Sequence, residues 1–271
     1  MTESKLRVLI FGAHPDDADS MSGGVAALYT QAGHTVKMYS LTNGDAGHMR
    51  IGGAPLAWRR RQEAALSGKT LGCEYITLDN HDGMLQPTLE VRNQVIAIVR
   101  NFRPDLVICP RMWDYHPDHR ACGTVVVDAM YMATVPNVVS GAEHLRAMPV
   151  IAYCYDHFQK PYPLQPDVVV DVSAVQERKL DAMSCHESQF YEWMPYNERF
   201  LDKVPEGAAA RRAWLAETYA PLFPRPEVYW PQLVARYGEA KARACTAIEV
   251  YEGSEYGSPL TEENKKTLFP F

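Results

Sequence analysis

The sequence predicts a single α/β domain in which a mostly parallel sheet carries helices on both faces. Two observations predict this fold. Short apolar, β-rich runs alternate with longer helix-compatible stretches, as repeated strand and helix units do. Polar and turn-forming residues gather directly after these runs, where parallel strands would end. With 271 residues, the chain is long enough for one large domain with a full core.

The order of the elements predicts how the strands are arranged. The expected strands are residues 6–11, 35–41, 74–78, 106–109, 150–155 and 168–172. The expected helices are residues 21–31, 57–71, 89–102, 121–132 and 174–188. This alternation is typical of a Rossmann-like, doubly wound sheet of order 3-2-1-4-5, which places the first and fourth strands side by side. The loops that follow these two strands should therefore face each other across a crevice.

The C-terminal part of the chain has a different composition. Residues 190–230 hold ten of the 28 aromatic residues and many prolines, whereas residues 251–271 end in a charged tail that predicts little. We therefore expect a core over about residues 5–190 and an aromatic, proline-rich C-terminal extension over about residues 191–271. Because aromatic side chains would not stay dispersed in water, the extension should pack on the core, as a wall of the site or as a subunit contact. We expect a homo-oligomer.

Composition excludes several classes of function. A formal charge of −6 and a pI near 5.9 argue against nucleic acid as a partner. The amino terminus leads directly into the first strand and no apolar run approaches a membrane span, so we expect no signal peptide, no membrane insertion and a cytoplasmic location. The six cysteines form no C-x-x-C pair, which indicates reduced structural thiols.

Two dense polar clusters follow the first and fourth strands. In the first, residues 11–17, His14 lies close to Asp16 and Asp17; a helix cap would explain one of these acidic residues but not all three side chains. The second, residues 111–120, contains His116 and His119. Because the crevice should bring the clusters together, they predict a catalytic metal site.

Two imidazoles and a carboxylate, from His14, Asp17 and His119, are the ligand set of a catalytic zinc that keeps a position open for water. His116 is a fourth candidate, since residues 14/17 and 116/119 are both i, i+3 pairs and spacing leaves the choice open. The usual nucleotide-binding signatures are missing: no G-x-G-x-x-G follows the first strand, and the sequence contains no G-x-x-x-x-G-K-[ST].

These clusters resemble the signature pair of the LmbE-like, or PIG-L type, zinc-dependent N-deacetylases. The resemblance covers roughly residues 5–190 and rests on Ala13-His14-Pro15-Asp16-Asp17 with His116-Pro117-Asp118-His119. Supporting marks are Arg60-x-x-Glu63, Leu71-Gly72, Asp82-Gly83, Lys179 and His186-Glu187-Ser188-Gln189. The chain departs from the pattern at His81, where proline is frequent, and in the roughly 80 residues after Gln189.

The resemblance implies a role for several residues. His14, Asp17 and His119 would bind one Zn²⁺ per chain, with Fe²⁺ possible in the cell, while Asp16 would act as the general base. His116, oriented by Asp118, would steady the tetrahedral intermediate or protonate the leaving amine. Arg60 and the Asp82 turn would contact the substrate. Independently of the resemblance, Trp113 or Tyr115 could offer an aromatic face to a sugar ring, or could simply pack at the rim.

The sequence therefore predicts a hydrolase that removes an N-acetyl group from a small GlcNAc-type amino sugar or its conjugate, releasing acetate and a free amine. One alternative is a zinc amidase acting on another amide, such as a thiol conjugate. Another is a metal-dependent sugar-binding module without turnover. An intact Asp16 with the His116/Asp118 pair counts against the binding module, because a binder needs no base beside the metal.

Overall fold

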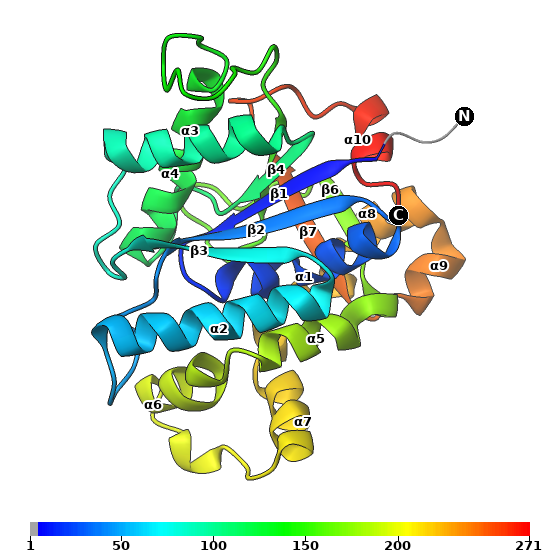
Figure 1. Ribbon diagram of the computed structural model, residues 1–271. Coiled ribbons are helices and arrows are strands. Elements are labelled where there is room, and N and C mark those ends of the chain that lie inside the picture. Colours follow the sequence, from blue (N-terminus) through cyan, green and yellow to red (C-terminus); the bar gives the residue numbers. More distant parts are fainter. Residues whose placement is uncertain (1–4) are drawn as a thin grey trace.

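Seven strands form one sheet in the computed structural model, which describes residues 5–271 (Figure 1). The strands are β1 (Arg7–Gly12), β2 (Thr35–Thr42), β3 (Glu74–Asn80), β4 (Leu106–Cys109), β5 (Val150–Cys154), β6 (Val168–Asp171) and β7 (Ile248–Gly253). Their order is β3-β2-β1-β4-β5-β7-β6, and β1 to β5 are parallel. The predicted α/β fold and its order 3-2-1-4-5 are confirmed.

Strand β7 was not predicted. It lies between β5 and β6 and runs antiparallel to both, so residues 248–253 belong to the sheet rather than to a peripheral extension. The sequence of β7 does not look like a buried strand, because it contains Glu249. This residue is buried, and its charge is neutralised by groups that are distant in the sequence. The Glu249 carboxylate accepts hydrogen bonds from the amides of Gly24 and Val25, each at 2.8 Å, and lies 2.8 Å from Lys179 Nζ. A local pattern contains none of these partners.

Five helices cover the two faces of the sheet: α1 (Asp17–Gln31), α2 (Gly53–Leu71), α3 (Leu89–Phe102), α4 (Pro117–Met132) and α5 (Gln176–Ser184). Helices α1, α2 and α5 pack on one face, where residues such as Val8, Ile10 and Met38 form the core. Helices α3 and α4 pack on the other face over Leu9 and Phe11 (Figure 1). The alternation of β1 side chains between two cores is what a fully covered strand requires.

Helix α4 begins at Pro117, four residues before the predicted start. His116 is its N-cap, Pro117 occupies the first turn and Asp118 supplies an acidic residue there. Proline and acidic residues are favoured at this end of a helix. The sequence therefore indicates a helix start at Pro117, although residues 117–120 were expected to lie in a loop. The consequence is that Asp118 and His119 are fixed on a rigid helix and not on a loop.

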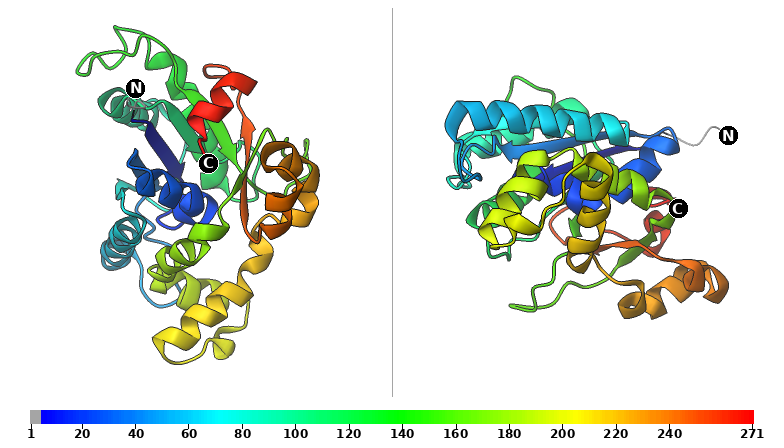
Figure 2. Two further views of the ribbon diagram at one scale, coloured as in Figure 1. Left: turned by 90° about the vertical axis from the view of Figure 1, so that its right-hand side faces the viewer. Right: turned by 90° about the horizontal axis from the view of Figure 1, so that it is seen from below.

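The chain after α5 supplies strand β7 and a series of short helices. Its helices are a π-helical turn (Ser188–Trp193), α6 (Met194–Asn197), α7 (Ala208–Thr218), α8 (Trp230–Tyr237), α9 (Glu239–Ala244) and α10 (Glu262–Leu268), with 3-10 turns at Leu201–Lys203, Ala220–Leu222 and Pro226–Tyr229. A further 3-10 turn, Ser173–Val175, leads into α5. Helix α5 is therefore shorter than the predicted helix over 174–188. Leu180 and Met183 of α5 form a buried cluster with Phe190 and Leu215, and the segment of α6 and α7 lies beside α5 in both views of Figure 2. No helix formed by residues 5–271 is both long enough and apolar enough to cross a membrane.

Candidate active site

A cavity of about 450 Å³ opens at the carboxyl edge of β1 to β4, within the size range of small-molecule sites. Its inner lining is His14, Asp16, Asp17, Ala46, Gly47, Arg60, Asp82, Gly83, Tyr115, His116 and His119. Its outer lining is Gln189, Trp193, Met194, Asn197, Glu198, Tyr219 and Leu222. Four other hollows on the described surface, from 570 to 770 Å³, are larger, but of these five only this one is lined by more than one histidine together with carboxylates. The two predicted clusters do meet here.

The turn between β1 and α1 positions Asp17. A Cβ on Gly12 would lie 2.6 Å from the Asp17 Cβ, so the close approach of this turn to the strand requires glycine. Asp17 Oδ2 accepts hydrogen bonds from the amides of Ala13 at 2.8 Å and His14 at 2.7 Å. Asp16 stands at the N-cap position of α1 but its side chain makes no capping hydrogen bond. The cap interpretation therefore does not explain the Asp16 carboxylate.

Three candidate ligand atoms form a nearly equilateral triangle. His14 Nδ1 lies 3.2 Å from His119 Nε2, and both nitrogens lie 3.5 Å from Asp17 Oδ2. Ligands at zinc distances on the corners of a tetrahedron are separated by about 3.4 Å. Two imidazole nitrogens and one carboxylate oxygen at this spacing fit a divalent metal with an open position.

Carboxylates also contact the outer nitrogen of each histidine in this triangle. His14 Nε2 lies 3.1 Å from Asp82 Oδ1 and 3.3 Å from Asp118 Oδ2, and His119 Nδ1 lies 3.1 Å from Asp114 Oδ1. Such partners fix the tautomer, keep the proton on the outer nitrogen and turn the other lone pair toward a metal.

The same carboxylates perturb the titration of the triangle. Burial lowers the pKa of His14, but hydrogen bonds to Asp118, Asp17 and Asp82 outweigh it and hold that pKa well above its ordinary value. Burial also lowers the pKa of His119, which the charge of Asp17 and the hydrogen bond to Asp114 raise to about 10. Burial raises the pKa of Asp17, but the charge of His119 carries it well below its usual range. The pKa of each group in the triangle is therefore shifted by the charged groups around it, as is common at functional sites.

Two other groupings bring possible ligand atoms within 4.8 Å of one another: His14 with His116 and His119, and His14 with Asp82 and Asp118. The second uses His14 Nε2, which already faces the two carboxylates. In the first, His116 Nδ1 accepts a hydrogen bond from the Asp118 amide at 3.2 Å, which leaves only Nε2 free. The triangle with Asp17 is favoured because, within residues 5–271, His14 Nδ1 and His119 Nε2 contact only members of the triangle. Asp17 Oδ2 accepts two backbone hydrogen bonds in addition.

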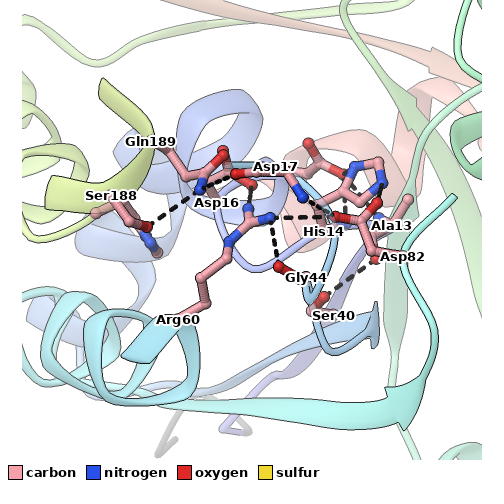
Figure 3. A network of polar contacts seen from close by, with 12 residues as sticks. Ala13, His14, Asp16, Asp17, Ser40, Gly44, Arg60, Asp82, Ser188 and Gln189 are labelled. Carbon is pink, nitrogen blue, oxygen red and sulfur yellow. Dashed lines mark hydrogen bonds and ion pairs between the residues drawn. The ribbon is translucent and has the colours of Figure 1, made fainter. Parts of the chain in front are cut away.

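Arg60 holds the Asp16 carboxylate. Arg60 Nη2 lies 2.7 Å from Asp16 Oδ1, and both side chains are buried. Figure 3 shows the guanidinium reaching from α2 toward Asp16, Gly44 and Asp82. Gly44 adopts a φ of +69°, and a Cβ there would lie 2.6 Å from Arg60 Nη1. Burial raises the pKa of Asp16 more than the charge of Arg60 lowers it.

The structure shows that Asp118 contacts His116 through its backbone amide and not through its carboxylate. The Asp118 carboxylate does not contact that imidazole: Oδ1 accepts a hydrogen bond from the Leu85 amide, and Oδ2 accepts one from the Gly83 amide and faces His14. Only the backbone amide of Asp118 reaches His116, by capping α4. Burial and the charge of His14 lower the pKa of His116. Because Nδ1 accepts the hydrogen bond from the Asp118 amide, the neutral ring carries its proton on Nε2, and the residue lines the cavity.

The three predicted substrate contacts have other surroundings. Arg60 is occupied by Asp16, and Asp82 bridges His14, Arg60 and the Gly47 amide. Trp113 is 40% exposed and does not line the cavity, whereas Tyr115 does. Arg60 and Asp82 therefore position other site residues, and Trp113 has no place in the lining.

Of the outer lining, the sequence singled out only Gln189, in the mark His186-Glu187-Ser188-Gln189. Trp193, Glu198 and Tyr219 come from the aromatic segment, whose composition predicted a wall or a subunit contact but no particular residue. The wall is fastened by long-range contacts: Ser188 Oγ donates to Glu63 Oε2 at 2.5 Å, and Gln189 Nε2 donates to the Gly47 carbonyl at 3.1 Å. The segment His186-Glu187-Ser188-Gln189 thus joins the outer wall to the core.

Comparison with known proteins agrees with this geometry. Residues 9–130 match the family described as PIG-L, GlcNAc-PI de-N-acetylase. The chain is 34% identical over 206 residues to a diacetylchitobiose deacetylase of Thermococcus kodakarensis, covering 70% of this chain and 74% of that protein. It is 23% identical over 239 residues to a 4-oxalmesaconate hydratase of Pseudomonas putida, covering 83% and 92%.

A solved structure, the N,N'-diacetylchitobiose deacetylase of Pyrococcus horikoshii in complex with an inhibitor, is similar with a TM-score of 0.69 and 25% identity, over 92% of this chain and 84% of that chain. The chain belongs to the PIG-L family of de-N-acetylases, as the sequence resemblance indicated.

Proposed function

We propose that this protein is a metal-dependent hydrolase that removes the N-acetyl group from a GlcNAc-type amino sugar or its conjugate. The observation that carries the proposal is the triangle of His14 Nδ1, Asp17 Oδ2 and His119 Nε2 beside a buried carboxylate, Asp16. A metal site next to a potential base is the arrangement that hydrolysis of an unactivated amide needs. The names of the relatives given above support an acetamido sugar as the substrate.

The donor set favours Zn²⁺, with Fe²⁺ as the alternative, because two imidazoles and one carboxylate suit either ion. When bound, such a metal supplies Lewis acidity toward water and toward an amide carbonyl.

The protein groups would divide the proton transfers among them. Arg60 fixes Asp16 Oδ1, which leaves Oδ2 to accept a proton from the attacking water. His116 Nε2–H would donate a hydrogen bond to the carbonyl oxygen as negative charge develops there. As the C–N bond breaks, the proton on Asp16 would pass to the leaving nitrogen, giving acetate and a free amine.

The test is to incubate protein loaded with Zn²⁺ or Fe²⁺ with N-acetylated mono- and disaccharides and with non-sugar acetamides, and to measure released acetate and amine. We expect equal amounts of both products from an acetamido sugar and none after chelation. Turnover of non-sugar amides alone would support the amidase alternative, and metal-dependent binding without acetate would support the binding module.

Because one relative is named a hydratase, 4-oxalmesaconate belongs in the same panel, with loss of its double bond as the readout. Hydration without any deacetylation would refute the proposal. Homo-oligomerisation stays a prediction, which size-exclusion chromatography with light scattering tests.

A further inference from the structure

The lining of the cavity carries more acidic side chains than arginines and lysines. It contains four carboxylates, those of Asp16, Asp17, Asp82 and Glu198, and a single guanidinium, that of Arg60. Among the cavity-lining residues there is no lysine. Because the site is partly enclosed, such an excess of one sign gives a potential that acts on any charged group of the substrate.

The single guanidinium is not available to a ligand. Arg60 is 2% exposed, lies 2.7 Å from Asp16 Oδ1 and lies 3.5 Å from Asp82 Oδ2. The nearest arginine along α2, Arg59, is also paired, with Nη1 and Nη2 at 2.7 and 2.8 Å from the Glu192 carboxylate. Apart from a metal bound at the triangle of His14, Asp17 and His119, an anionic substrate group would therefore meet no unpaired arginine or lysine among the lining residues.

Glu198 differs from the other three carboxylates. It is exposed at the cavity wall, and within residues 5–271 no hydrogen bond or ion pair engages its carboxylate. Trp193 lies on the same wall, with its ring stacked at 6.1 Å on that of Tyr196. An unpaired carboxylate attracts an ammonium group through its charge, and an indole on the same wall can add to this through its ring quadrupole.

We propose that an outer subsite, formed by Trp193, Asn197 and Glu198, selects amino sugars whose aglycone is uncharged or carries an ammonium group and discriminates against anionic aglycones. Glu198 is its specificity-determining residue. The inference rests on the proposed deacetylase function and adds to it the charge class of the group attached to the sugar.

Three glycosides of N-acetylglucosamine with one anomeric configuration test the proposal: methyl, carboxymethyl and aminoethyl. They differ little in size but carry a neutral, an anionic and a cationic aglycone. We expect kcat/KM for the carboxymethyl glycoside to be about tenfold below that for the methyl glycoside, and the aminoethyl glycoside to match or exceed the methyl one. The difference should shrink as salt is added, because part of it acts through solvent.

The Glu198→Lys variant should reverse the order of the charged glycosides, with the ratio between substrates as the readout rather than the absolute rate. Glu255→Lys is the matched control. Glu255 is exposed on the chain that continues from β7 past the amino end of β5, the edge of the sheet opposite to the cavity. Its variant makes the same change of charge and should leave the ratio as in the unmodified protein.

Equal kcat/KM for the carboxymethyl and methyl glycosides would overturn the charge selection. So would a ratio of kcat/KM between the charged glycosides that Glu198→Lys leaves unchanged. In either case, released acetate would still support the deacetylase function. Should Glu198→Lys fail to fold, the salt dependence of the ratio in the unmodified protein decides the question, because a steric preference would not respond to salt. No acetate from any of the three glycosides would refute both the proposed function and this inference.

Discussion

Replacing Arg60 with glutamine should leave the Asp16 carboxylate buried without its cation. The two side chains are 2% and 6% exposed with 2.7 Å between Nη2 and Oδ1, so water does not compensate for the loss. Removing one partner of a buried ion pair costs about 3–5 kcal/mol, whereas a surface pair is worth about 0–1 kcal/mol. Arg61→Gln is the matched control, since Arg61 is 42% exposed and its Nη2 lies 3.6 Å from Asp79 Oδ1.

The loss of stability should depend on pH through Asp16. Burial raises the pKa of this carboxyl despite the opposing charge of Arg60, and the pKa should rise further without that charge. A carboxyl whose folded pKa exceeds its unfolded value contributes stability that is fully present below the unfolded pKa and is lost as pH rises through the folded pKa. The deficit of Arg60→Gln should therefore be largest at neutral pH and narrow in acid.

Urea unfolding at neutral and mildly acidic pH, with chelator present for every protein, measures this deficit. The double variant Asp16→Asn/Arg60→Gln removes both charges and should regain about 1–3 kcal/mol relative to Arg60→Gln. If Arg60→Gln loses no more stability than Arg61→Gln, or if the double variant regains nothing, the buried pair does not stabilise the site as argued here.

Three further variants test the other positions of the site. His119→Ala should lose bound metal, while Cys73→Ala, which removes a thiol outside the cavity, should keep a full equivalent by elemental analysis; a metal-replete His119→Ala would contradict the ligand triangle. Asp118→Asn replaces the carboxylate that faces His14 Nε2 with an uncharged amide and should lower metal affinity by about 10- to 100-fold in a competition titration. Unchanged affinity would show that this carboxylate does not affect metal binding by His14. His116→Ala should retain metal and lose about 10²- to 10³-fold in kcat, whereas loss of metal would place His116 among the ligands.

The sequence predicted the order of the first five strands because apolar runs and helix-compatible runs alternate regularly, and right-handed crossovers leave few topologies open. It also predicted that His14 and His119 would meet, since both follow strands that flank the crevice. Strand β7 could not be predicted, because the groups that neutralise Glu249 lie on Lys179 and on the amides of α1, far away in the sequence.

The surroundings of the predicted substrate contacts could not be predicted for a related reason. A polar side chain near a site can face the ligand or another side chain, and local sequence does not distinguish these two uses. Arg60 and Asp82 face inward to Asp16 and His14, which only the packing of α2 and the β3 loop against the β1 turn decides. The outer wall depends on how the segment after α5 folds back over the cavity. The composition of that segment does not indicate which of its residues, such as Trp193 or Glu198, face the cavity.

We propose that Asp17 holds the metal while Asp16 transfers the proton, and metal content measured together with turnover tests this division of roles. Asp16→Asn removes the proton acceptor and leaves the triangle intact, so we expect it to retain a full equivalent of metal and lose about 10²- to 10⁴-fold in kcat on the best substrate found. Asp17→Asn should lose metal affinity, with activity partly restored by excess Zn²⁺. A metal-free Asp16→Asn beside a metal-replete, inactive Asp17→Asn would contradict the account and reverse the two roles.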